Sequence, residues 1–158
     1  MRDYKDTERV DRRTKEMIKQ NVVFVENKAG SLKRVTGILA DNGINIYGFA
    51  CFDAPEFAIF RMICNDPDKA ETVLNRSGYM NRITQAIVVD MKDQVGGLDE
   101  LLKVASDSNV SLDYIYTSFH RKDLRPVVIL QTEDGAVTEC ILKNNGFNVF
   151  TSAEELEK

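Results

Sequence analysis

From residue 17 onward, apolar residues follow two alternating spacings. Residues 18–26 are rich in Val and Phe and predict a β-strand. After the polar turn at 27–30, apolar residues recur at helical spacing over 31–41. Ser31 is the expected N-cap of this helix, and Gly43 suits the left-handed conformation that ends a helix.

Four further elements follow the first helix. Residues 44–52 and 57–64 predict two strands, with a turn at 53–56 that contains proline. A second helix is expected to begin at Asp66-Pro67 and to end at Gly78, before a short strand at 79–83. The order strand, helix, strand, strand, helix, strand is a split βαβ arrangement. It predicts an antiparallel sheet with both helices on one face.

The whole pattern then recurs about 66 residues later. The stretch 22–32 returns as 88–98, since 96 − 30 and 98 − 32 both give 66. Gly78 and Gly146 also correspond, at a spacing of 68. The second copy predicts strands at 85–91, 111–119, 126–132 and 147–151, and helices from 96–97 and over 136–145. We therefore expect an α+β fold of two tandem ferredoxin-like βαββαβ units, with domains at 17–84 and 85–152.

The two ends of the chain differ from this pattern. Residues 1–16 are almost all charged or polar and lack an apolar period, which predicts a disordered leader. Asp3-Tyr4-Lys5-Asp6 is equally compatible with the remnant of a purification tag. Residues 153–158 form an acidic tail that we expect to be frayed.

Composition narrows the class of protein. The 158 residues are 43% apolar, carry a net charge of −4 and have a pI near 5.1. An acidic chain is a poor candidate for binding nucleic acid, which requires a basic surface. There is no apolar run of the ~18 residues that a membrane span needs and no signal-peptide pattern. The sequence therefore predicts a cytoplasmic protein that contacts neither nucleic acid nor membrane.

The residue types that carry catalysis or bind metals are sparse. The chain has three cysteines without C-x-x-C spacing, and we interpret them as reduced packing thiols. The only histidine, His120, falls in a basic turn at 120–122 that we expect to be solvated. Zinc sites need several ligands, and no phosphate-binding glycine loop occurs. We expect no enzymatic activity, no catalytic residue, no metal site and no cofactor.

Each copy resembles an ACT domain, a small-molecule-sensing module of amino-acid metabolism. The resemblance rests on Val23–Leu32 and on Leu39–Ile46 at the expected distance, and on 95–98 and 110–112 in the second copy. The whole is most similar to stand-alone tandem ACT proteins, which carry no attached enzyme and are taken to be regulatory and amino-acid-binding. Family members often have proline where this chain has Ala29 and Val95. The turns here are therefore less restricted in φ.

The two turn-to-helix junctions are the candidate ligand sites. They expose unpaired backbone N–H groups at the positive end of a helix dipole, which suits a carboxylate. Asn and Asp side chains near the same edge of the predicted sheet suit an ammonium group. The resemblance implies the same place, near the first turn and at the interface of paired ACT units. The candidate residues are Asn27, Ala29, Gly30, Ser31, Leu32, Asn45, Ile46, Asp93, Val95, Gly96, Gly97, Leu98 and Ser111.

Structural roles compete with these assignments. Gly30 and Gly96 also satisfy turn geometry, Asn27 and Asp93 also cap turns, and Ser111 replaces Asn45 in the second copy. Three functions stay open at this point: an amino-acid sensor, a regulatory subunit that meets a biosynthetic enzyme, and a ligand-free dimerisation module. Open sheet edges and uncovered sheet faces favour a homodimer in each case.

Overall fold

The computed structural model describes residues 17–158, and the predicted leader at 1–16 lies outside the described residues. The described chain separates into two compact units. The first repeat comprises Lys19–Thr84. The second repeat comprises Gln85–Leu156, together with Met17 and Ile18.

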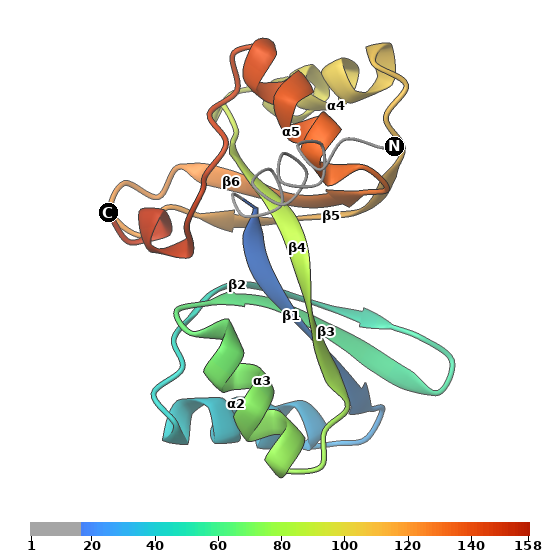
Figure 1. Ribbon diagram of the computed structural model, residues 1–158, viewed down its shortest axis with the longest axis vertical. Helices are drawn as coiled ribbons and strands as arrows, with labels where there is room; N and C mark the ends of the chain where they lie inside the picture. Colours follow the sequence, from blue (N-terminus) through green and yellow to red (C-terminus); the bar gives the residue numbers. More distant parts are fainter. Residues whose placement is uncertain (1–16) are drawn as a thin grey trace, which may run out of the picture. The chain divides into compact units, whose positions relative to one another are not determined.

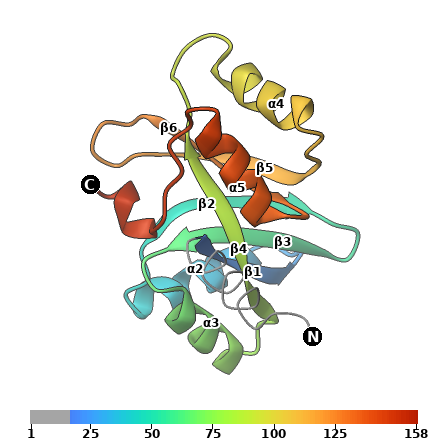
Figure 2. The same ribbon diagram turned by 45° about the horizontal axis from the view of Figure 1, so that its top comes forward.

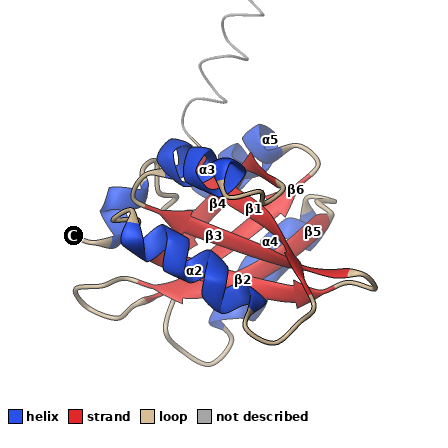
Figure 3. Ribbon diagram, turned by 90° about the horizontal axis from the view of Figure 1, so that it is seen from below, coloured by secondary structure: helices blue, strands red, loops and turns tan. Residues whose placement is uncertain are grey.

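The first repeat is an antiparallel sheet covered on one face by two helices (Figure 1). Strand β3 pairs antiparallel with β1 on one side and with β2 on the other, so β3 lies between them. Helices α2 and α3 both lie against the same side of these strands (Figure 3). The elements are β1 (Ile18–Glu26), α2 (Ser31–Asp41), β2 (Ile46–Asp53), β3 (Phe57–Cys64), α3 (Pro67–Arg76) and the start of β4 (Asn81–Asp90).

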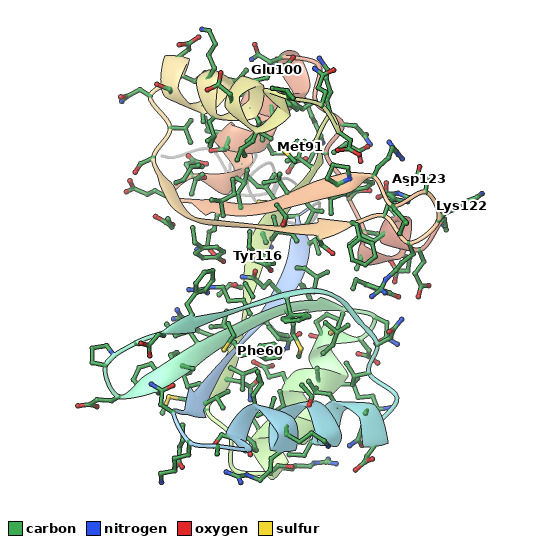
Figure 4. All side chains as sticks on the ribbon, turned by 180° about the vertical axis from the view of Figure 1, so that it is seen from behind. Phe60, Met91, Glu100, Tyr116, Lys122 and Asp123 are labelled. Atoms are coloured by element: carbon green, nitrogen blue, oxygen red, sulfur yellow. The ribbon has the colours of Figure 1, made fainter. Side chains whose placement is uncertain are left out.

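Alternation along the strands produces the core of the first repeat. Val23 and Val25 of β1 point to the helix side of the sheet, where Phe60 of β3 joins them (Figure 4). The helices contribute Val35 and Leu39, spaced by four residues and therefore on one helix face. All five side chains are at most 2% exposed. Their burial is the main source of stability for this unit.

The second repeat has the same architecture (Figure 2). Strand β6 pairs antiparallel with both β4 and β5. Its core is formed by residues of the matching positions, among them Val89, Leu101 and Val128. The added elements are α4 (Gly97–Asp107), β5 (Leu112–Phe119), β6 (Pro126–Thr132), α5 (Gly135–Asn144) and the short 3₁₀ helix η1 (Ala153–Leu156). The predicted pair of ferredoxin-like βαββαβ units is thus confirmed.

The two repeats keep one register throughout. Helix α2 begins at Ser31 and α4 at Gly97, and 97 − 31 is 66. Helix α3 begins at Pro67 and α5 at Gly135, and 135 − 67 is 68. The offset therefore grows by two residues in the hairpin between the second and third strands. Positions can be matched by adding 66 up to β2 and 68 from β3 onward.

Three predicted segments differ from the structure. The strands expected at 79–83 and 85–91 are one continuous strand, Asn81–Asp90, because no turn-forming residue interrupts the β-branched sequence. The closing strand expected at 147–151 is reduced to a bridge between Val149 and Val89. The tail is not frayed throughout, because η1 buries Leu156 completely. None of the helices between residues 17 and 158 combines the length and apolar character that a membrane crossing requires.

Candidate functional site

The same backbone turn leads into the first helix of both repeats. In the first repeat, Lys28 N–H donates to the Glu26 carbonyl, and Ser31 N–H donates to the Lys28 carbonyl. In the second repeat, the residues 66 positions later make the same two bonds, over 2.9 and 3.0 Å. The N-cap residues Gly30 and Gly96 have φ values of 82° and 88°, in the left-handed region that favours glycine. The predicted turn glycines therefore have a geometric role in both repeats.

The charges at the two helix N-termini are opposite. No side chain caps either helix by a hydrogen bond, so the first backbone N–H groups of both rely on other acceptors. Helix α4 has Asp99 and Glu100 in its first turn, which complement the positive end of its dipole. Helix α2 has no acidic residue there and carries Arg34 at the position that matches Glu100. The start of α2 is therefore the more favourable of the two for an anion.

Arg34 is held over the start of α2 by Ser31. Its Nη2 donates to the Ser31 hydroxyl over 3.1 Å, and Ser31 itself is 2% exposed. Within residues 17–158 no carboxylate lies at ion-pair distance from Arg34, because nearby Glu26 pairs with Lys28 instead. An exposed guanidinium without a carboxylate partner, fixed beside a helix N-terminus, is a ready binding group for an incoming carboxylate.

A pocket of about 610 Å³ lies next to this guanidinium. It opens between the end of β1, the start of α2 and the loop that precedes β4. Its lining combines aromatic and apolar side chains with one basic and two acidic groups. The residues are Phe24, Val25, Glu26, Ser31, Arg34, Glu56, Phe57, Gly78, Tyr79 and Met80. The volume is within the range of pockets that hold small molecules.

The second repeat has a pocket at the matching place, with a volume of about 360 Å³. Met91 at the end of β4 and Glu100 on α4 come from the elements that correspond to β1 and α2 (Figure 4). Its cations are already paired: Lys92 lies 2.8 Å from Glu100, and Arg125 lies 2.6 Å from Asp123 and 3.4 Å from Asp90. The hydrogen bond to Asp123 is the main cause that raises the pKa of Arg125.

Much of the difference between the two pockets comes from one pair of positions, which is aromatic in the first repeat and ionic in the second. Phe24 and Phe57 pack edge to face in the first repeat, with ring centroids 5.2 Å apart. The matching positions, 24 + 66 and 57 + 68, are Asp90 and Arg125, which form the ion pair described above. Asn148 also donates to Asp90, over 2.8 Å, where the first repeat has Met80. An aromatic wall in one repeat is thus a hydrogen-bonded polar network in the other.

The structure does not bring all the predicted site residues together. Asn27 is near the first pocket, but its amide donates to Asp53 and to the Ala54 carbonyl in the β2–β3 hairpin. The backbone N–H of Asn45 donates to the side chain of Asn65, which follows the far end of β3, and the side-chain amide of Asn45 donates to Glu157. The 8 residues of β3 span seven steps of ~3.3 Å, so its two ends are about 23 Å apart. Asn45 and its neighbour Ile46 are therefore not at the sheet edge where the sequence suggested they would join Asn27.

Of the remaining predicted site residues, some lie at the two turns or pockets and others do not. Ser111 lines a shallow hollow at the C-terminal end of α4, away from Gly96. Gly97 is buried, and a Cβ built on it would lie 2.1 Å from the Lys92 carbonyl oxygen, so its role is close backbone packing. Leu32 packs on the core, and Asp93 lines the second pocket. Ala29, Val95 and Leu98 are exposed around the two turns.

Two expectations about reactive side chains need correction. His120 is not solvated: it is 7% exposed, and its ring packs against Phe150. The hairpin tip that carries Lys122 and Asp123 is exposed, as Figure 4 shows, but His120 precedes it at the end of β5. Among the cysteines only Cys64 is a buried packing thiol, since Cys51 and Cys140 are exposed. Burial raises the pKa of Cys64 to about 11.

Sequence reasoning missed the residues that distinguish the first pocket, chiefly Arg34, Phe24, Phe57 and Met80. The signal was available in the repeat itself. The register pairs Arg34 with Glu100 and Glu26 with Lys92, which are two charge reversals at one site. Positions that differ between two copies of one unit indicate divergent chemistry, whereas shared positions indicate shared geometry.

Comparisons with known proteins agree with this architecture. Residues 16–158 match the family described as ACT domain pair. A protein of Bacteroides thetaiotaomicron with a known crystal structure is 27% identical, with 90% of this chain and 97% of that chain covered and a TM-score of 0.81. The regulatory subunit of aspartate kinase from Thermus thermophilus is 12% identical over 83% and 95%, with a TM-score of 0.60, and shares the fold. No curated protein matches.

Proposed function

Since this chain belongs to the ACT domain pair family, whose modules are regulatory and non-catalytic, we propose that it is a regulatory protein that binds an amino acid in the pocket of the first repeat. The observation that carries this proposal is Arg34. It is an exposed guanidinium without a carboxylate partner in the described chain, beside a helix N-terminus without acidic residues. Both features favour an anion at the same point.

The other charges of the pocket fit the second pole of an amino acid. Glu26 and Glu56 line the same pocket as Arg34. A ligand that carried only a carboxylate would gain nothing from them, whereas a zwitterion can place its ammonium group against a carboxylate. Glu26 already pairs with Lys28, so Glu56 is the lining carboxylate without an ion-pair partner in residues 17–158. One cation and this carboxylate around an apolar wall support an α-amino acid over a simple organic acid.

The first test is a thermal-shift screen of the full chain against the twenty amino acids. Ligand at about 100 times its dissociation constant adds roughly 2.7 kcal/mol to stability, which moves the unfolding midpoint by several degrees. Positive ligands are then measured by isothermal titration with Arg34→Met and with the control Lys33→Met. Both residues are exposed on the first turns of α2, and only Arg34 lines the pocket.

We expect Arg34→Met to weaken binding by roughly 10- to 100-fold, since a hydrogen bond to a charged group contributes about 1.5–3 kcal/mol. Lys33→Met should leave affinity within about twofold. A chain that no amino acid stabilises would contradict the sensor proposal. Capture of a biosynthetic enzyme would then support the regulatory-subunit alternative, and dimerisation alone would support the ligand-free module.

We also propose that the chain acts as a homodimer in the cytoplasm. Strand β2 is the outer strand of the first repeat and β5 the outer strand of the second, and outer strands commonly pair with a second copy. Sedimentation equilibrium of the full chain tests this proposal. A mass near twice 17.9 kDa is expected, and a monomer at micromolar concentration would contradict it.

A further inference from the structure

We infer that the pocket of the first repeat selects amino acids with a bulky apolar side chain, such as phenylalanine, tyrosine, leucine or methionine, and that the second repeat does not bind the same ligand. This inference rests on the proposed function and names its ligand class. At matching positions, the first repeat has an aromatic wall and the second has an ionic network.

The first pocket places exposed apolar side chains side by side. Met80 is 73% exposed and Phe57 is 36% exposed, and both line the pocket together with Phe24 and Tyr79. The Phe24–Phe57 contact is edge to face, with an interplanar angle of 77°, which leaves ring surface open to a third apolar group. A ligand that covers these side chains removes apolar area from water, which is favourable.

Small or polar amino acids cannot use this wall. The side chain of glycine, alanine or serine would leave the rings and Met80 in contact with water. Aspartate would bring a second carboxylate close to Glu26 and Glu56, which also line the pocket. Like charges repel at short range, so acidic amino acids are disfavoured further. The lining thus selects by side-chain size and by the absence of negative charge.

The second pocket lacks each of these features. It is smaller, about 360 Å³ against about 610 Å³. Glu100 occupies the position of Arg34 and pairs with Lys92, so a ligand carboxylate would meet an anion there. Asp90, Arg125 and Asn148 replace Phe24, Phe57 and Met80, and both Arg125 and Asn148 donate to Asp90. A bulky apolar side chain would have to disrupt this network, and it would meet only Met91 and Phe147 as apolar lining side chains.

The test is isothermal titration of the full chain with eight free amino acids: Phe, Tyr, Leu, Met, Gly, Ala, Ser and Asp. We expect at least one of the first four to bind at least tenfold more tightly than each of the last four, with a stoichiometry of one per chain. The variant Met80→Asn, which copies the second repeat at an exposed position, should weaken the preferred ligand about threefold or more. Phe57→Arg should weaken it further, and Phe119→Arg is its matched exposed control.

The outcomes separate this inference from the proposed function. Tight binding of a small or acidic amino acid that depends on Arg34 would overturn the selectivity and leave the sensor intact. Binding of two ligands per chain would overturn the assignment to one repeat. No binding of any amino acid would contradict the proposed function itself. Circular dichroism melting curves check that the variants fold, and Met80→Asn provides a readout even where Phe57→Arg is destabilising.

Discussion

The two repeats share a backbone and differ in chemistry at the same point. Their entry turns make the same two hydrogen bonds, and their N-cap glycines agree in φ to within a few degrees. Yet the first repeat surrounds that turn with aromatic side chains and a guanidinium without a carboxylate partner in the described chain, and the second surrounds it with ion pairs. The comparison teaches that the turn is a structural requirement of the unit, and that ligand chemistry depends on the side chains placed around it.

The largest effect on stability is expected at Gly97, the turn residue that is matched by Ser31 in the first repeat. A Cβ on Gly97 would lie 2.1 Å from the Lys92 carbonyl oxygen, whereas the matching residue in the first repeat is Ser31. Gly97→Ala should therefore lower the free energy of unfolding by about 3 kcal/mol through overpacking. Urea denaturation measures it, with Ser31→Ala as the matched control, expected to cost about 1 kcal/mol. Equal losses would show that the two turns are packed alike.

Exchanging the charged residues at the starts of α2 and α4 tests which repeat binds the amino acid. Arg34→Glu copies the second repeat and should abolish amino-acid binding, a loss of about 100-fold or more. Glu100→Arg in the second repeat frees Lys92 from its 2.8 Å ion pair, and should leave the affinity of the first site unchanged. Titration calorimetry of both variants separates them. Loss of binding in Glu100→Arg alone would move the site to the second repeat.

A buried thiol makes the first repeat sensitive to alkaline pH. Burial raises the pKa of Cys64 from 9.0 to about 11, and the matching residue in the second repeat is Thr132. Because the folded-state pKa is the higher one, the stabilisation is complete below pH 9 and is lost as pH rises toward 11. The loss between pH 9 and 10 should be about 1 kcal/mol. Denaturation of wild type and Cys64→Thr at pH 8, 9 and 10 measures the difference, and parallel curves would contradict it.

The smallest effect concerns the C-terminal segment, which belongs to the second repeat alone. Burial opposes ionisation of Glu155, but hydrogen bonds from Thr151 and Ser152 lower its pKa overall, below 4.5. The stabilisation is therefore present above pH 4.5 and is lost as pH falls through the folded-state value. Amide exchange of η1 should accelerate by a few-fold below pH 4, after correction for intrinsic rates. Glu155→Gln should remove this acceleration, whereas Glu154→Gln should retain it.

Much of the fold was predictable because it depends on local patterns that occur twice. Apolar alternation, the turn glycines and the proline near the start of α3 each indicate an element without reference to distant residues. The closing strand of the second repeat was overestimated because its pairing depends on long-range contact with β4, and only Val149 bridges to it. The burial of His120 was missed for the same reason, because its ring packs against Phe150, which is distant in the sequence.

The candidate site was only partly predictable. The start of α2 could be located to within one residue, since the sequence predicts Ser31 as the N-cap and the structure has Gly30 there. Asn45 was predicted at the wrong end of the strands, because α2 returns the chain to the end opposite Asn27. The pocket lining comes from four separate segments of the first repeat. These segments come together only in the folded unit. The charge reversals between the repeats at Arg34 and Glu26 nevertheless indicate, from sequence alone, where the two pockets differ.

The most direct test of the central claim is a crystal structure of the full chain with saturating phenylalanine, or with the tightest-binding amino acid from the titrations. We expect one ligand per chain in the first repeat, with its carboxylate on Arg34 and its side chain against Phe24, Phe57 and Met80. A ligand bound in the second repeat, or an empty first pocket at saturation, would contradict it.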